Sequence, residues 1–122
     1  MSVDEKTLAE MGRLQERMGF SGRSEVMRAG VRKLAAENRE VAGLSGKIKS
    51  VLLMVHSESA EEKATEVKHS FEDIIATQVH TNLASGKCLE IFVLDGKAER
   101  VREMVKKAQA NKKVEYLKLI VP

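Results

Sequence analysis

Cysteine, proline and aromatic residues are all scarce in this sequence of 122 residues. It holds one Cys, one Pro, three Phe, one Tyr and no Trp. A single cysteine excludes an internal disulfide bond and fits a protein of the reducing cytoplasm. No apolar run approaches the roughly 20 residues of a membrane helix, and the first residues lack the pattern of a signal peptide. We therefore expect a cytoplasmic protein without a membrane anchor, whose core is built from aliphatic side chains and Met.

An excess of charge of one sign is also lacking. The chain has 21 Lys and Arg against 18 Asp and Glu, a formal net charge of +3. Because neither half is polycationic, any contact with nucleic acid must come from individually placed side chains. A chain this short has little room for a deep catalytic cleft. It should form one domain, or two small ones that depend on a partner.

Two amphipathic helices are predicted in the first 45 residues. Asp4 is placed to cap the first helix, Gly19 to end it and Ser21 to cap the second. The apolar residues of the first helix recur at spacings of three and four: Leu8, Met11, Leu14 and Met18. A unit of about 45 residues with so few apolar side chains cannot make a stable core alone. We expect it to fold as an intertwined dimer.

After a short hinge over residues 41–46, the pattern changes to alternating strands and helices. Strands are predicted over 48–56, 74–83, 87–94 and 114–121, the second and third joined by a turn at 84–86. A capping box of Ser59 and Glu62 should start one helix, with an apolar stripe of Ala60, Ala64, Val67 and Phe71. A second helix should begin at Ala98, after Asp95 and Gly96 end the third strand. The order β-α-β-β-α-β predicts a ferredoxin-like α+β domain.

Three residues with soft or borderline ligand atoms lie near one another in this second part: His69, His80 and Cys88. His80 and Asn82 are two apart on a strand and share a face. Hairpin pairing would bring Cys88 close to both. A thiolate with two imidazoles suits Ni(II), Cu or Zn(II). Spacing alone, with no short C-x-x-C motif, favours a simpler interpretation: a buried cysteine and two surface histidines. A nucleophilic pair of Cys88 and His80 is a third possibility, but no orienting acid or oxyanion hole can be located for it.

Three further residues could support such chemistry. Glu90 is two past Cys88 on the same face, so it could hold a ligand histidine in place, or it could be solvated. Arg23 and Ser24 open the second helix, where free N–H groups and a positive dipole end can anchor a phosphate. An ordinary capped helix explains that pair equally well.

Two stretches of the sequence carry a resemblance to a known family. They are GFSGRSE at 19–25, and TQVHTN at 77–82 followed by CLEIFVLDG at 88–96. Together they resemble the nickel-responsive transcriptional regulators, a family of ribbon–helix–helix repressors, over nearly the whole chain. The resemblance implies a ribbon–helix–helix unit for DNA binding and dimerisation over residues 1–42. It implies an ACT-like domain for metal sensing and tetramerisation over residues 46–122.

The resemblance also implies a ligand set and makes a metal site the preferred interpretation. In the family, nickel is held by two histidines of one strand, a later cysteine and a histidine from a neighbouring subunit. His80 and Cys88 match two of the first three, and His69 matches the neighbour's histidine. Asn82 stands in place of the remaining histidine, and Glu90 matches an acidic position beside the cysteine. Ni(II) is thus the expected metal, with Zn(II) or Cu as alternatives.

DNA binding is the second implication of the resemblance. Ribbon–helix–helix dimers read base edges with a paired strand from each chain. Only residues 1–3 precede the first helix here, so Ser2 alone keeps an outward position, while Arg23 and Ser24 remain as backbone anchors. Either the chain starts further upstream or the ribbon is curtailed. We expect a metal-responsive regulator, not an enzyme, that binds a double-stranded operator as a homodimer assembling to a homotetramer. The alternative is a metal- or small-ligand-binding oligomer that no longer reads DNA.

Overall fold

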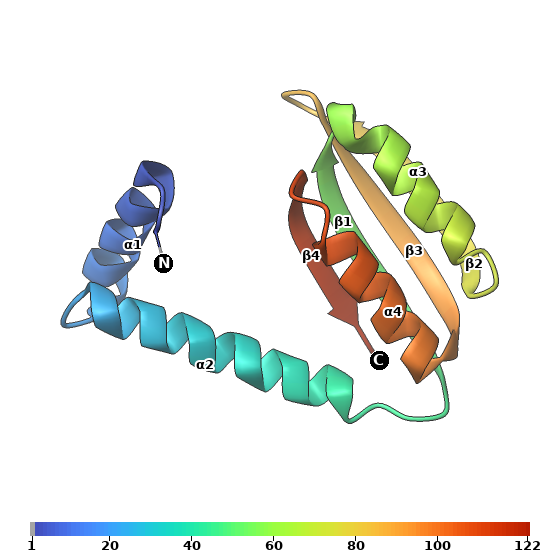
Figure 1. Cartoon of the computed structure of the whole chain (residues 1–122), viewed down its shortest axis with the longest axis horizontal. Coiled ribbons are helices and arrows are strands. Elements are labelled where there is room, and N and C mark those ends of the chain that lie inside the picture. The colour runs from blue at the N-terminus through green and yellow to red at the C-terminus, as the bar shows by residue number, and fades with distance from the viewer. Residues whose placement is uncertain (1) are drawn as a thin grey trace. The chain divides into compact units, whose positions relative to one another are not determined.

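A computed structural model describes residues 2–122 of the chain. Met1, the first residue of the predicted N-terminal unit, lies outside the described residues. The chain divides into two compact units, Met1–Gly43 and Leu44–Pro122. The first contains helices α1 (Glu5–Met18) and α2 (Arg23–Ala42), drawn in blue and cyan in Figure 1. Helix α2 therefore includes only the first two residues of the predicted hinge, which shortens to the residues after Ala42.

The ends of α1 are capped as predicted, whereas the start of α2 is not. Asp4 accepts a hydrogen bond from the backbone N–H of Thr7 at 2.7 Å, and Gly19 ends α1 with a φ of 76°. The prediction that Ser21 caps α2 is wrong, because the N-cap is Gly22. The carbonyl of Gly22 accepts the N–H groups of the first turn, so the helix begins one residue later than a Ser21 cap would set it.

The first unit has almost no interior of its own. Helix α1, all of which the structure describes, buries no side chain, and α2 buries only Val26. Large apolar side chains are left exposed along both helices: Leu8, Leu14, Met18, Met27, Val31 and Leu34. These two helices therefore bury too few apolar side chains to form a core of their own.

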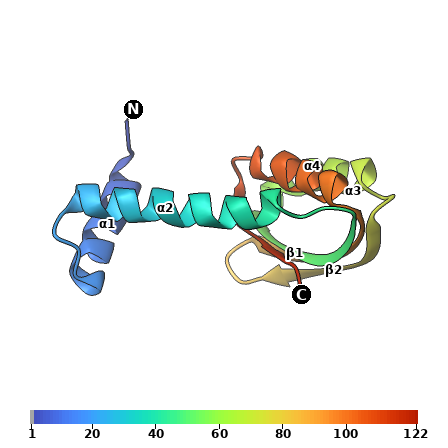
Figure 2. The same ribbon diagram turned by 90° about the horizontal axis from the view of Figure 1, so that it is seen from below.

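The second unit is a four-stranded antiparallel sheet with two helices on one face (Figures 1 and 2). The sheet order is β2-β3-β1-β4, which confirms the β-α-β-β-α-β arrangement and the α+β class. The bounds of its elements are β1 (Lys47–Ser57), a short 3-10 turn (Glu58–Ala60), α3 (Glu61–Ser70), β2 (Ile75–Leu83), β3 (Lys87–Lys97), α4 (Ala98–Gln109) and β4 (Val114–Ile120).

Two local predictions in this unit are wrong. The Ser59–Glu62 capping box does not form, because Ser59 lies inside the 3-10 turn with its Oγ 2.8 Å from Ser57 Oγ, and α3 begins after Ala60. Asp95 and Gly96 do not end β3. Strand β1 extends far enough to pair with both residues, so the ladder continues to Lys97.

Gly96 has a packing role rather than a turn role. A Cβ atom at this position would lie 2.4 Å from Cγ2 of Ile74, a distance that no real contact tolerates. The glycine therefore lets the residue before β2 approach the β3 backbone. That approach is fixed by a hydrogen bond of 2.8 Å from the N–H of Asp95 to the carbonyl of Ile74.

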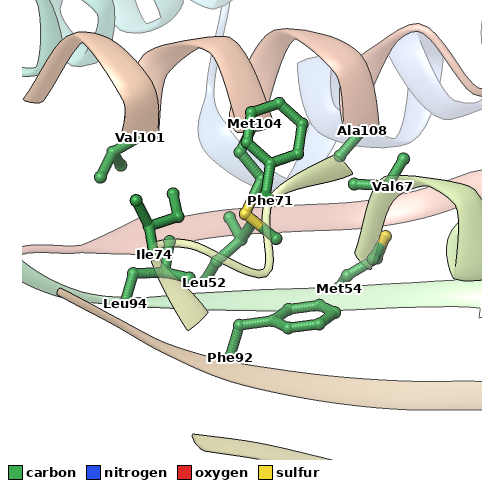
Figure 3. Close-up of a cluster of buried hydrophobic side chains, with 10 residues drawn as sticks. All are labelled: Leu52, Met54, Val67, Phe71, Ile74, Phe92, Leu94, Val101, Met104 and Ala108. Carbon is green, nitrogen blue, oxygen red and sulfur yellow. The ribbon is translucent and has the colours of Figure 1, made fainter. Parts of the chain in front are cut away.

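The core lies between the sheet and the two helices (Figure 3). Its largest buried side chains are Phe92, Leu52, Met54 and Leu94 from the sheet and Met104 from α4. The predicted stripe of Ala60, Ala64, Val67 and Phe71 is buried throughout. The opposite face of the sheet is left uncovered by α3 and α4. Among residues 2–122, no helix has both the length and the apolar character needed to span a membrane.

Candidate metal centre

The β2–β3 hairpin sets the positions of the candidate ligands. Its tight turn places Ser85 and Gly86 at φ values of 68° and 70°. The resulting register pairs Asn82 with Cys88 and His80 with Glu90. Directly paired residues of an antiparallel ladder share a face. All four therefore lie on the face of the sheet that the helices cover.

Cys88 is buried at this face, with 1% of its surface exposed. Its Sγ lies 3.7 Å from Oδ1 of Asn82, which accepts a weak hydrogen bond from the thiol. Burial, followed by the carboxylates of Glu61 and Glu58, raises the pKa of the Cys88 thiol. The thiol is therefore protonated at neutral pH, and a metal that binds here must displace that proton.

The two histidines lie on the surface of the single chain. His80 is exposed on β2. His69, near the end of α3, has 71% of its side chain exposed, and its Nδ1 lies 2.8 Å from Oε1 of Glu72. Taken as one chain, this geometry matches the simpler interpretation of a buried cysteine and two surface histidines.

The described residues of one chain do not bring a full set of metal ligands together. Within residues 2–122, no three His, Cys, Asp or Glu side chains come close enough together to hold a metal ion. The hairpin offers the thiolate of Cys88 and the imidazole of His80, with the amide oxygen of Asn82 as a harder and weaker donor. A metal held at this hairpin would need a further donor from outside the chain.

Glu90 is not solvated, which corrects one of its two sequence interpretations. Its side chain is 1% exposed. Its Oε2 lies 2.6 Å from Nε2 of His56, and its Oε1 lies 2.6 Å from Nζ of Lys68. Gln78 donates a further hydrogen bond of 3.2 Å to Oε1.

Sequence reasoning missed the buried His56, which has no exposed surface. It is the last residue of the strand predicted over 48–56, and the sequence pattern gave it no separate role. One signal could have revealed it. His56 continues the alternation of Leu52 and Met54, so it lies on the buried side, where a titratable side chain needs a polar partner.

The candidate DNA contacts all belong to the first unit. Arg23 and Ser24 are exposed in the first turn of α2, where backbone N–H groups lack helical acceptors. Ser2 is exposed ahead of α1, and residues 2–4 form no strand in this chain. The candidate anchors Arg23 and Ser24 are thus exposed at the start of α2, while no ribbon strand forms within the described residues.

Comparison with known proteins decides the family. Residues 50–121, which span the sheet and both of its helices, match the family described as the NikR C-terminal nickel-binding domain. The chain belongs to this family. The predicted resemblance to nickel-responsive regulators is therefore confirmed. The NikR family consists of regulators rather than enzymes.

Relatives of the chain extend the match beyond the NikR C-terminal domain. A protein of Methanocaldococcus jannaschii named "putative nickel-responsive regulator" is 32% identical over 124 residues, covering 99% of this chain and 88% of the relative. A protein of Geobacter metallireducens with the same name is 31% identical over 123 residues, with the same coverage.

A solved structure supports the fold of the NikR domain alone. An uncharacterized protein of Thermotoga maritima superimposes with a TM-score of 0.58 at 18% identity, covering 62% of this chain and 98% of that one.

Proposed function

We propose that this chain is a cytoplasmic, nickel-responsive transcriptional regulator that binds double-stranded operator DNA. One observation carries the proposal. In a domain of the NikR nickel-binding family, the hairpin register places Cys88 opposite Asn82 and brings His80 to the same face. A thiolate and an imidazole at one hairpin are donors suited to Ni(II), and also to Zn(II) or Cu.

The metal would be shared between chains. His80 and Cys88 of one copy would supply the nitrogen and sulfur donors, the Asn82 amide oxygen a third contact, and His69 of a second copy the remaining nitrogen. Two observations support this division: the ligand set is incomplete within residues 2–122, and His69 is largely exposed on α3. The bound metal would supply a positive charge that replaces the thiol proton and joins the two copies.

Exposed apolar surface supports assembly into a homodimer and then a homotetramer. Residues 1–42 would form an intertwined ribbon–helix–helix dimer, since its apolar residues lack a core of their own. Residues 46–122 would form an ACT-like tetramer core. On that unit, the face not covered by helices exposes Val79, Val93, Tyr116 and Ile120. Apolar patches of this kind commonly mark protein interfaces.

Metal would act by favouring the assembly that binds DNA. Arg23 and Ser24 at the start of α2 would anchor a phosphate, and Ser2 would face the groove. A ligand shifts a conformational equilibrium only by its differential affinity for the two states. Couplings of this kind are typically about 1–3 kcal/mol, or roughly 5- to 150-fold in DNA affinity.

The test is DNA binding with and without Ni(II). Duplexes selected from a random pool in the presence of Ni(II) would be measured by fluorescence anisotropy, with chelated protein and the Cys88→Ala variant as controls. We expect tighter binding with Ni(II) in the wild-type protein only. Equal affinity with and without metal would refute sensing. Metal binding without selection of any duplex would instead favour an oligomer that does not read DNA.

A further inference from the structure

A buried polar network lies directly beside the candidate ligands. The two carboxylate oxygens of Glu90 have different partners. Oε2 lies 2.6 Å from Nε2 of His56, and Oε1 lies 2.6 Å from Nζ of Lys68. His56 is also held at its other ring nitrogen, since Nδ1 lies 2.8 Å from the carbonyl oxygen of Ser57. A carbonyl oxygen only accepts, so Nδ1 carries a hydrogen. The other ring nitrogen, Nε2, is the atom that bonds to Glu90.

Such a network needs an explanation beyond stability. Removing a carboxylate and its partners from water carries a large desolvation penalty, and apolar side chains of similar volume would often serve the fold as well. A buried ionic network can instead be retained because it holds the surrounding elements in one arrangement rather than another. What this network fixes follows from the elements that it joins.

Three of the four elements joined by the network also carry a candidate ligand. Lys68 precedes His69 on α3, Gln78 is two residues before His80 on β2, and Glu90 is two residues after Cys88 on β3. His56 brings β1 into the network as a fourth element, and its register partner on β3 is Cys88. The network therefore ties together the three elements whose relative positions decide where the ligands lie.

We infer that Lys68 and His56, acting through Glu90, are positioning residues for the metal centre. Lys68 holds the end of α3 on the sheet so that His69 is presented outward at a fixed place relative to Cys88 and His80. His56 holds the Glu90 carboxylate in the orientation that Lys68 needs. This inference rests on the proposed function, because it assumes that these residues bind metal.

Lys68→Met tests the inference most directly, because it keeps the aliphatic stem and removes the ammonium group. Lys63→Met is the matched control, an exposed lysine five residues earlier on the same helix. Nickel affinity would be measured by competition with a chelator, together with the thiolate-to-metal absorption band. Hydrogen exchange would report on α3 in the metal-free protein. Circular dichroism would confirm that the variants fold.

We expect Lys68→Met to weaken nickel binding by about 10- to 100-fold, as loss of a partner just outside the ligands typically does. In the metal-free variant, the rate of backbone hydrogen exchange should rise in α3 and stay unchanged in β1 and β3. Lys63→Met should change neither the nickel affinity nor the exchange rate of α3. Lys68→Arg should bind nickel nearly as tightly as the wild-type protein, because it keeps the ion pair with Glu90. His56→Gln, whose amide can still donate to Glu90, should bind nickel more tightly than His56→Leu.

The outcomes separate this inference from the proposed function. Wild-type protein that binds no nickel would overturn the proposed function and the inference with it. Wild-type protein that binds nickel, with Lys68→Met binding it equally well, would overturn the inference alone. Equal losses in Lys68→Met and Lys68→Arg would also overturn it, because the ion pair would then not be the cause.

Discussion

At the scale of single residues, Cys88 combines burial with the strongest donor atom of the candidate site. We predict that Cys88→Ala and His80→Ala each weaken Ni(II) binding by more than the about 10- to 100-fold typical of residues outside the ligand set. The reason is that each substitution removes a donor atom outright. Absorbance titration with Ni(II) would measure the change, with Lys63→Met as a folded control. Wild-type affinity in both alanine variants would place the site elsewhere.

Asn82 stands where the resemblance to nickel-responsive regulators implies a histidine. Its amide oxygen lies 3.7 Å from the Cys88 sulfur, so a histidine at this position could offer a nitrogen donor to the same metal. We predict that Asn82→His tightens Ni(II) binding on the order of tenfold, about 1.4 kcal/mol. Thr81→His is the matched control, because adjacent strand residues point to opposite faces. Equal effects of the two substitutions in a chelator competition would show that Asn82 is not near the metal.

The candidate ligands could be named from the sequence because they depend on local rules. A short turn over residues 84–86 fixes the hairpin register, so the neighbourhood of His80, Asn82 and Cys88 follows from spacing and a family resemblance. His56 could not be found in this way. Its partner Glu90 is 34 residues away, and the contact depends on the β1–β3 pairing, which no local pattern determines. Burial of a polar side chain is set by tertiary structure.

At the scale of elements, the prediction from a long periodic stripe succeeded, whereas predictions from one or two residues succeeded at Asp4 and Gly19 and failed at several other positions. The stripe from Ala60 to Phe71 is buried as its spacing predicted. In contrast, Ser59 lies in a 3-10 turn and does not cap α3. Asp95 and Gly96 pair with β1 and do not end β3. Tertiary contacts outweigh local propensities of this size.

Helix α4 is tied to the segment after α3 by an ion pair that can be followed by pH. Arg100 donates two hydrogen bonds of 3.0 Å to the carboxylate of Asp73 and lies over the ring of Phe71. These bonds from Arg100 hold the pKa of Asp73 below its usual value. A lowered carboxylate pKa stabilises the folded state above the unfolded pKa, and that contribution is lost as the pH falls through the folded pKa.

We predict that Arg100→Gln raises the pKa of Asp73 toward that of an unperturbed aspartate, because the hydrogen bonds from Arg100 are what lower it. The carboxyl resonance of Asp73, followed by NMR titration, would measure the shift. Glu103, which also bonds to Arg100, provides a variant for comparison, since Glu103→Gln should leave the Asp73 titration nearly unchanged. An Asp73 titration that is the same with and without Arg100 would refute the assignment of the shift to this pair.

At the scale of the whole molecule, assembly and metal binding should depend on each other. If His69 is donated by a second copy, a chain that cannot assemble retains every ligand residue and still loses the site. Val93 tests this dependence, because it is 39% exposed on the sheet face that the helices leave open. Val93→Lys places a charge at the proposed interface without touching His80, Asn82 or Cys88.

We predict that Val93→Lys shifts the protein to smaller species in light scattering after size exclusion. The same variant should lose most of its Ni(II) affinity, because a burial penalty for lysine opposes the assembly that would supply His69 from a second copy. Glu66→Lys, a charge change on the exposed side of α3, should alter neither property. A monomeric Val93→Lys variant with wild-type Ni(II) affinity would show that one chain holds the metal alone. The exposed His69 would then have to move toward Cys88 within its own chain.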